Sequence, residues 1–163
     1  MEWLQALVVT LLAVLAARTF VAESFVVRGH SMEPTVHHGE RVLVLKAIYR
    51  WRPPRPGDIV VFRPPGRPGS EYIKRVVAIS GSTVRVARGR VYRDGRLLAE
   101  PYVAFEDRSE LPEASVPPGA VFVLGDNRPG SDDSRLFGPV PLDRVDGRAV
   151  LVYWPPWKAR WLH

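Results

Sequence analysis

The chain has 163 residues, a length that fits one domain, or one domain with an anchor. It contains no cysteine, which excludes disulfide bonds, thiol catalysis and cysteine-ligated metals. Its net charge of +6 suits nucleic acid or an anionic lipid surface. Because the arginines are spread through the chain and not gathered in one block, we expect no nucleic-acid partner.

The N-terminal segment is apolar. The run from Trp3 to Ala17 has only Gln5 and Thr10 as polar residues, and it reaches Ala22 if Arg18 is included. A bilayer-spanning helix needs about 20 residues, and an arginine near its end can extend to the interface. We therefore expect residues 1–23 to form one N-terminal transmembrane helix. A cleaved signal peptide and a buried N-terminal helix remain as alternatives.

The remainder, residues 24–163, has the pattern of a mainly β domain. Sixteen prolines cluster between short apolar runs, which favours strands joined by stiff turns over a helical bundle. The pair Asp94-Gly95 predicts a type I′ hairpin. We expect antiparallel sheets that form a partly closed barrel, with strands at residues 25–28, 41–45, 58–62, 72–79, 83–88, 90–93, 96–98, 120–124 and 147–154.

Residues 99–118 break this pattern. They are rich in acidic residues and proline and have no clear periodicity. We expect them to form a long loop or small excursion from the barrel.

Two residues are candidates for chemistry. Ser31 lies between Gly29-His30 and Met32, with Pro34 three residues further on, so we expect a fixed turn that exposes its hydroxyl. Lys74 interrupts an apolar strand and shares a face with Tyr72 and Val76. If burial lowers its pKa, the amine becomes a general base that could activate a serine. Ser31 in a plain loop, and Lys74 on an outer strand edge, remain as the simpler interpretations.

The segment from Gly125 to Arg135 is dense in hydrogen-bonding groups and could brace such a site from outside. Its acidic residues lack the spacing of a calcium loop, and the four histidines lack a paired metal spacing. We therefore expect neither a metal nor a cofactor. His30 is an alternative base, although adjacent residues on an extended chain point apart.

These segments together resemble bacterial type I signal peptidases, the membrane-anchored Ser/Lys endopeptidases that remove signal peptides from exported proteins. The resemblance covers most of the chain. It rests on an N-terminal anchor followed by Ser31-Met32-Glu33-Pro34-Thr35, then Gly57-Asp58-Ile59-Val60-Val61-Phe62, Tyr72-Ile73-Lys74-Arg75-Val76-Val77 with Ser80-Gly81, and Gly125-Asp126-Asn127-Arg128 with Ser131, Asp133-Ser134-Arg135 and Phe137-Gly138.

The resemblance implies a role for each matching residue. Ser31 would be the nucleophile and Lys74 the general base, with Ser131 orienting the lysine and Asp133 and Arg135 forming a supporting ion pair. The family's second oxyanion donor, a hydroxyl in some members, falls on Gly29, so that donor is unassigned here.

The resemblance also implies how the substrate binds and where. A preprotein would lie extended beside residues 25–28, with Phe25, Val26, Val27 and Gly29 binding it, and would be cut after small residues. The catalytic domain would be extracytoplasmic on a single-pass cell-membrane protein, although the positive-inside rule alone favours the opposite orientation. Residues 99–118 would be the remnant of a variable lobe. We expect a monomer whose partners are preproteins and the lipid bilayer.

Two other interpretations stay open. One is a self-cleaving Ser/Lys repressor, although this chain has an apolar segment where such proteins carry a DNA-binding region. The other is a membrane-tethered, non-enzymatic β-barrel that binds anionic partners.

Overall fold

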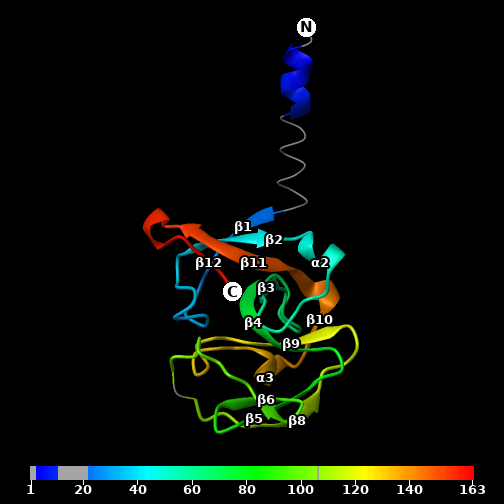
Figure 1. The fold of residues 1–163 in the computed structure, drawn as a ribbon, viewed down its shortest axis with the longest axis vertical. Coiled ribbons are helices and arrows are strands. Elements are labelled where there is room, and N and C mark those ends of the chain that lie inside the picture. Colours follow the sequence, from blue (N-terminus) through cyan, green and yellow to red (C-terminus); the bar gives the residue numbers. More distant parts are fainter. Residues whose placement is uncertain (1–2, 11–21, 106) are drawn as a thin grey trace.

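The computed structural model describes residues 3–10, 22–105 and 107–163, and within them strands dominate. The larger sheet has eight strands in the order β1-β2-β11-β3-β4-β9-β10, with β12 paired to β11 (Figure 1). Its strands are β1 (Ala22–Val26), β2 (Arg41–Leu45), β3 (Ile59–Phe62), β4 (Tyr72–Ile79), β9 (Ala120–Leu124), β10 (Val140–Pro141), β11 (Val145–Trp154) and β12 (Arg160–Trp161).

The second sheet has four strands in the order β7-β6-β5-β8. They are β5 (Thr83–Ala87), β6 (Arg90–Arg93), β7 (Arg96–Leu97) and β8 (Leu111–Ser115). Every strand pair in both sheets is antiparallel, and the larger sheet curls into a half-barrel. The prediction of a mainly β, antiparallel, partly closed fold is confirmed.

The most buried strands lie in the middle of the larger sheet. The strands β3 and β9 are buried along their whole length, as their unbroken apolar sequences predict for central strands. In β4, neighbouring side chains enter cores on opposite sides of the sheet, Val76 in one and Val77 in another. The strand that carries Lys74 is thus packed on both faces, which makes it a rigid support.

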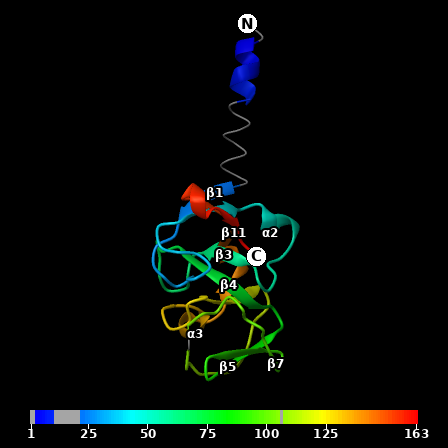
Figure 2. The same ribbon diagram turned by 60° about the vertical axis from the view of Figure 1, so that its left-hand side comes forward.

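The smaller sheet covers one of these cores. Val84 and Val86 of β5 are buried while Arg85 between them is exposed, as expected for a sheet with one wet face. Its hairpin turns at Asp94 and Gly95, both with positive φ (53° and 74°), so the predicted type I′ turn is confirmed. Figure 2 shows this sheet at the end of the domain remote from β1.

Residues 99–118 contribute more than a loop. They contain β8, which pairs with β5, and Val116, which is fully buried. The strand β8 was not predicted because it does not alternate: its adjacent residues Pro112 and Glu113 are both exposed, and its pairing with β5 has a register shift. The first strand also differs from its prediction, since β1 covers Ala22–Val26 and not residues 25–28.

Four short helical turns complete the fold: α2 (Ile48–Trp51), α3 (Ser134–Phe137), and the 3₁₀ turns η1 (Leu142–Arg144) and η2 (Pro156–Lys158). Each is too short for helical periodicity to be visible in the sequence, so none was predicted. The turn α3 lies directly after the Gly125–Asp133 segment and its N-cap is Asp133.

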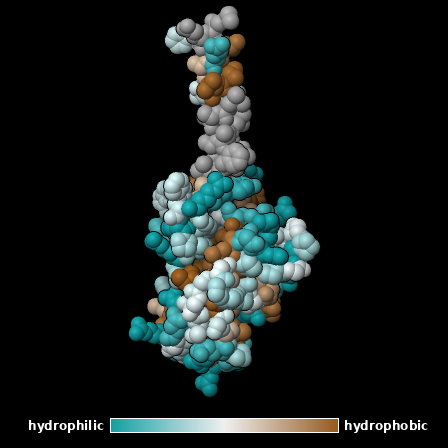
Figure 3. Space-filling model, turned by 90° about the vertical axis from the view of Figure 1, so that its right-hand side faces the viewer, coloured by the Kyte–Doolittle hydropathy of each residue, from teal (hydrophilic) through white to brown (hydrophobic). Residues whose placement is uncertain are grey.

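Residues 1–2 and 11–21 of the predicted transmembrane segment lie outside the described residues. Residues 3–10 are helical, and their apolar side chains are exposed (Figure 3). In the part of the chain that the structure describes, no helix is long and apolar enough to cross a bilayer. The anchor over residues 1–23 therefore stays a prediction.

Candidate active site

Ser31 lies in the turn that follows β1. Met32 within this turn and Val36 directly after it are buried in the core, and Val36 N–H donates to Met32 O at 2.9 Å. The carbonyl oxygen of Ser31 accepts a hydrogen bond from Asn127 N–H at 3.0 Å. Because the backbone is held on one side, the hydroxyl projects on the other, as the flanking glycine and proline predict.

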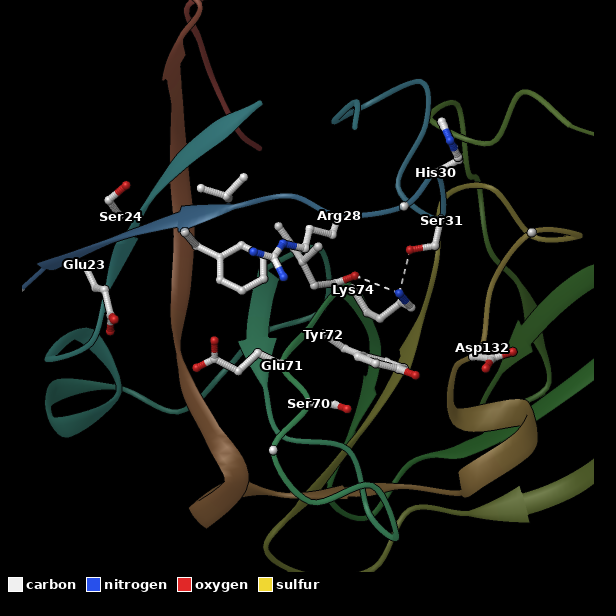
Figure 4. Close-up of a pocket in the computed structure, with 16 residues that line it drawn as sticks. Glu23, Ser24, Arg28, His30, Ser31, Ser70, Glu71, Tyr72, Lys74 and Asp132 are labelled. Atoms are coloured by element: carbon white, nitrogen blue, oxygen red, sulfur yellow. Dashed lines mark hydrogen bonds between the residues drawn. The ribbon is translucent and has the colours of Figure 1, made fainter. Parts of the chain in front are cut away.

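Lys74 lies on β4, and its side chain is only 4% exposed. Its Nζ is 2.7 Å from Ser31 Oγ and 3.0 Å from Ile73 O (Figure 4). The ring of Tyr72, on the same face of the strand, lies 5.2 Å from Nζ. The sequence placed Lys74 and Tyr72 on one face, and the structure brings that face to Ser31.

The surroundings of Lys74 favour the neutral amine. Burial lowers the pKa of Lys74 to about 8, against the opposing effect of three carboxylates, those of Asp133, Asp132 and Asp126. With a pKa of about 8, roughly one Lys74 amine in ten is unprotonated at pH 7, far more than for an ordinary lysine. An unprotonated amine at 2.7 Å from a hydroxyl can remove its proton.

Asp133 and Arg135 form the expected ion pair. Asp133 is fully buried, and its Oδ1 accepts from Arg135 Nε at 2.9 Å while its Oδ2 accepts from Gly125 N–H at 3.1 Å. Arg135 also donates to Asp107 Oδ2 and to the backbone oxygen of Arg128. The pair therefore ties both ends of the Gly125–Arg135 segment to each other and to residue 107.

Ser131 differs from its expected arrangement. Its Oγ is buried and has no hydrogen-bond partner among the described residues, so the expected bond to the Lys74 amine is not present. Gly125 explains why this serine can come so close to the nucleophile. A Cβ at residue 125 would lie 2.3 Å from Ser131 Oγ and 2.5 Å from Ser31 O, so only glycine fits between them.

An open groove of about 720 Å³ runs past the Ser31 hydroxyl. One wall is β1 with residues 28–31, and the other is residues 69–74 (Figure 4). Phe25, Val26 and Gly29 line it as expected. Val27 does not, because its side chain is packed in the core, where it is 2% exposed.

Three groups at the site were not assigned a role from the sequence. Arg28 and Asp132 line the groove. Arg28 lies in the predicted strand 25–28 and Asp132 in the Gly125–Arg135 segment, but neither was singled out. The third group is the buried ion pair of Arg75, the residue after Lys74, with Asp126 at 2.8 Å. In the sequence, an arginine within the apolar strand and an aspartate directly after another apolar strand were signals for such a pair.

The histidines take no part in the dyad. His30 points away from Ser31 and pairs with Glu33, at 2.8 Å between Nδ1 and Oε1. Within residues 3–10, 22–105 and 107–163, no group of three or more histidine, aspartate or glutamate side chains is placed to hold a metal ion.

A serine hydroxyl held against a buried amine in an open groove is the arrangement of a serine hydrolase with an amine as base. The family model for signal peptidases, peptidase family S26, matches residues 1–154. The chain is 42% identical to the probable signal peptidase I-1 of Synechocystis over 162 residues, covering 95% of this chain and 82% of that protein. It is 34% identical to signal peptidase I T of Bacillus subtilis, covering 95% and 86%.

A solved structure agrees. The crystal structure of a signal peptidase I from Enterococcus faecalis matches with a TM-score of 0.52 and 34% identity, over 58% of this chain and 95% of that one. The chain belongs to the signal peptidase family S26. It is a serine endopeptidase that cleaves signal peptides, which replaces the repressor and binding-module interpretations.

Proposed function

We propose that Ser31 and Lys74 form the catalytic dyad that cuts signal peptides from exported preproteins. The observation that carries this proposal is the 2.7 Å between Ser31 Oγ and the buried Nζ of Lys74. A serine needs a base within hydrogen-bond reach, and a lysine serves only where its pKa is lowered. Both conditions are met at this pair.

The chemistry follows in two stages. Neutral Lys74 takes the Ser31 proton as Oγ attacks the scissile carbonyl carbon, and the Lys74 ammonium then gives that proton to the departing amine. This leaves the signal peptide esterified to Ser31. A water molecule, deprotonated by the same amine, hydrolyses the ester and restores both side chains.

The backbone N–H of Ser31 is the candidate for one donor to the oxyanion. The Gly29 N–H is already used, because it donates to His38 Nδ1 at 3.0 Å. The open space where a Gly29 side chain would stand leaves room for a water or a group of the substrate itself. We assign the second donor to one of these and not to the Gly29 amide.

The substrate is proposed to bind as an added strand. The outer edge of β1 has no ladder partner among the described strands, and β9 pairs with β4 only from Arg75 onward. The residues Tyr72 and Ile73 thus face β1 across the groove with their own edge open. An extended peptide can pair with either edge, which brings its scissile carbonyl to Ser31.

Cleavage after small residues is proposed from the family resemblance. The aromatic side chains of Phe25 and Tyr72 line the groove that would receive the residues before the cut. Substrates with Ala-X-Ala before the cut would fit such a site.

We further propose a single-pass protein with its catalytic domain on the extracytoplasmic side of the cell membrane, acting as a monomer. The exposed tryptophans of α2 and of the chain from the end of β11 onward support a contact with the bilayer interface. Both segments lie at the end of the domain that carries β1 (Figure 1). The exposed tryptophans there are Trp51, Trp154, Trp157 and Trp161.

The proposal is tested with the full chain in detergent and a preprotein that has an Ala-X-Ala junction. We expect cleavage at that junction, abolished by Ser31→Ala and by Lys74→Ala, while Lys158→Ala as a matched control keeps wild-type activity. Activity that survives Ser31→Ala, or cleavage at another place, would overturn the assignment.

A further inference from the structure

Just before the turn that carries Ser31, the backbone of Gly29 is bound by a side chain that has no role in the proposed catalytic steps. Gly29 has a φ of 95°, and its N–H donates to Nδ1 of His38 at 3.0 Å. We propose that His38 is a positioning residue for the dyad, which holds the Gly29 amide through an unprotonated imidazole. The inference rests on the proposed role of Ser31 as nucleophile.

The contact extends a backbone ladder. Val27 N–H donates to Glu40 O, and Gly39 N–H donates to Val27 O, both at 2.9 Å. The next N–H on that side of the strand belongs to Gly29, and there the imidazole of His38 takes the place of a carbonyl as acceptor. The His38 side chain thus extends the hydrogen bonding of this strand from Val27 to Gly29, where the turn with the nucleophile begins.

This extension matters because of what lies on the other side of the strand. Strand alternation turns the peptide groups of Val26 and Arg28 toward the groove, where the substrate strand is proposed to pair. Gly29 and Ser31 themselves line that groove. A loosened Gly29 amide would therefore shift both the pairing edge and the hydroxyl, and small errors in the position of reacting atoms are costly.

The contact also depends on protonation. Nδ1 can accept only while it carries no proton, and histidine is the side chain that ordinarily titrates between pH 5 and 8. Several titratable or charged groups surround His38. The ring of His30 stacks on it at 5.5 Å, Glu33 bridges His30 and His37, and Glu40 binds the His37 amide and Arg160. Protonation of His38 would add a cation here and release the Gly29 amide.

Asparagine offers a matched rescue. Its Oδ1 is bonded to Cγ as Nδ1 is in histidine, so it can accept from the same N–H, and it does not titrate. We expect His38→Ala to lower kcat/KM by about 3- to 10-fold, the factor of one net hydrogen bond, mainly through kcat. His38→Asn should stay within about twofold of wild type. The matched control is His37→Ala, which changes the neighbouring residue and does not touch the Gly29 N–H. Its kcat/KM should also stay within about twofold of wild type.

The experiment measures cleavage of an Ala-X-Ala preprotein by the full chain in detergent between pH 5 and 9. We expect His38→Asn to keep wild-type kinetics across this range, while His38→Ala loses activity. Thermal unfolding of each variant checks that the fold is kept.

Two results would overturn the proposal: wild-type kinetics for His38→Ala, or an equal loss in His38→Ala and His38→Asn. Ser31→Ala is measured in parallel. Activity that survives that change would sink the dyad itself, and this failure is distinct because it does not depend on residue 38.

Discussion

Lys74 combines burial with a position beside three carboxylates. Desolvation lowers its pKa, and the charges of Asp133, Asp132 and Asp126 raise it, with a net value of about 8. The balance decides at which pH the enzyme works, because only the neutral amine can accept the Ser31 proton.

The first prediction concerns this balance. The kcat/KM for signal-peptide cleavage should fall as pH drops through about 8. Asp132 is half exposed and pairs with Arg67 at 2.7 Å, so Asp132→Asn removes a negative charge and leaves a positive one unpaired. The acid limb should then move to lower pH. Asp143→Asn, at a charge that does not act on Lys74, is the control; an unmoved limb in Asp132→Asn would contradict the assignment.

The second prediction concerns stability. The pKa of Lys74 is lower in the folded chain than its ordinary value of 10.5, so the unfolded chain binds more protons between pH 8 and 10.5. The free energy of unfolding of the wild type should therefore rise with pH across that window, by about 3 kcal/mol from this group. Lys74→Met lacks the contribution. The measurement is the difference in stability between the two proteins at pH 7 and pH 10.5, and a constant difference would refute a depressed pKa.

Single residues also mark the limit of prediction from the sequence. The face shared by Lys74 and Tyr72 followed from strand period alone. Val27 was misplaced because Phe25, Val26 and Val27 were all assigned to the substrate, although consecutive side chains of an extended chain cannot all point to one face. Asp132 could not be found, because its effect on Lys74 depends on a distance between segments far apart in the chain.

At the scale of elements, the segment from Gly125 to Arg135 is held by partners from residues 99–118. Arg128 binds Glu100 at 2.6 Å and Arg135 binds Asp107 at 2.8 Å, and all four side chains are largely buried. The stretch without periodicity thus braces the loop beside the nucleophile. Sequence pattern misses such a role because it resides in ion pairs and not in hydrophobic alternation.

The third prediction tests the close approach at Gly125. Gly125→Ala places a methyl group 2.3 Å from Ser131 Oγ and 2.5 Å from Ser31 O, so the nucleophile turn must move. We expect kcat to fall by about 100-fold, the cost of a misplacement near 1 Å, with the fold retained. In Gly130→Ala the added group meets only the Asn127 side chain, at 3.1 Å, and a much smaller loss is expected. Equal kinetics for both variants would contradict this packing.

At the scale of the whole molecule, the curled sheet leaves two strand edges open on either side of the dyad, and its rigidity keeps them apart. The strands were predictable because their apolar runs and turn residues are strong local signals. Their order was not, since β11 inserts between β2 and β3 through long-range pairing that no local pattern encodes.

The fourth prediction concerns Arg75, whose contacts join segments that are far apart in the sequence. Arg75 binds Asp126, the backbone oxygens of Gly57 and His163, and the ring of Tyr102. Removing one partner leaves a buried charge, so Asp126→Asn should cost about 3–5 kcal/mol in the free energy of unfolding. Arg63→Ala, at an exposed pair with Asp146, should cost below about 1 kcal/mol. Denaturant unfolding of both variants measures this, and similar costs would count against the account.

Catalysis by this dyad depends above all on an amine at position 74, and the absence of cysteine from the chain allows a direct test. Lys74→Cys introduces one thiol, which aminoethylation converts into a lysine analogue with its amine restored. We predict that Lys74→Cys does not cleave a preprotein and that the alkylated protein, verified by mass, regains cleavage at the same junction. Activity in the unalkylated variant, or none after complete alkylation of a folded protein, would contradict the role of Lys74 as the general base.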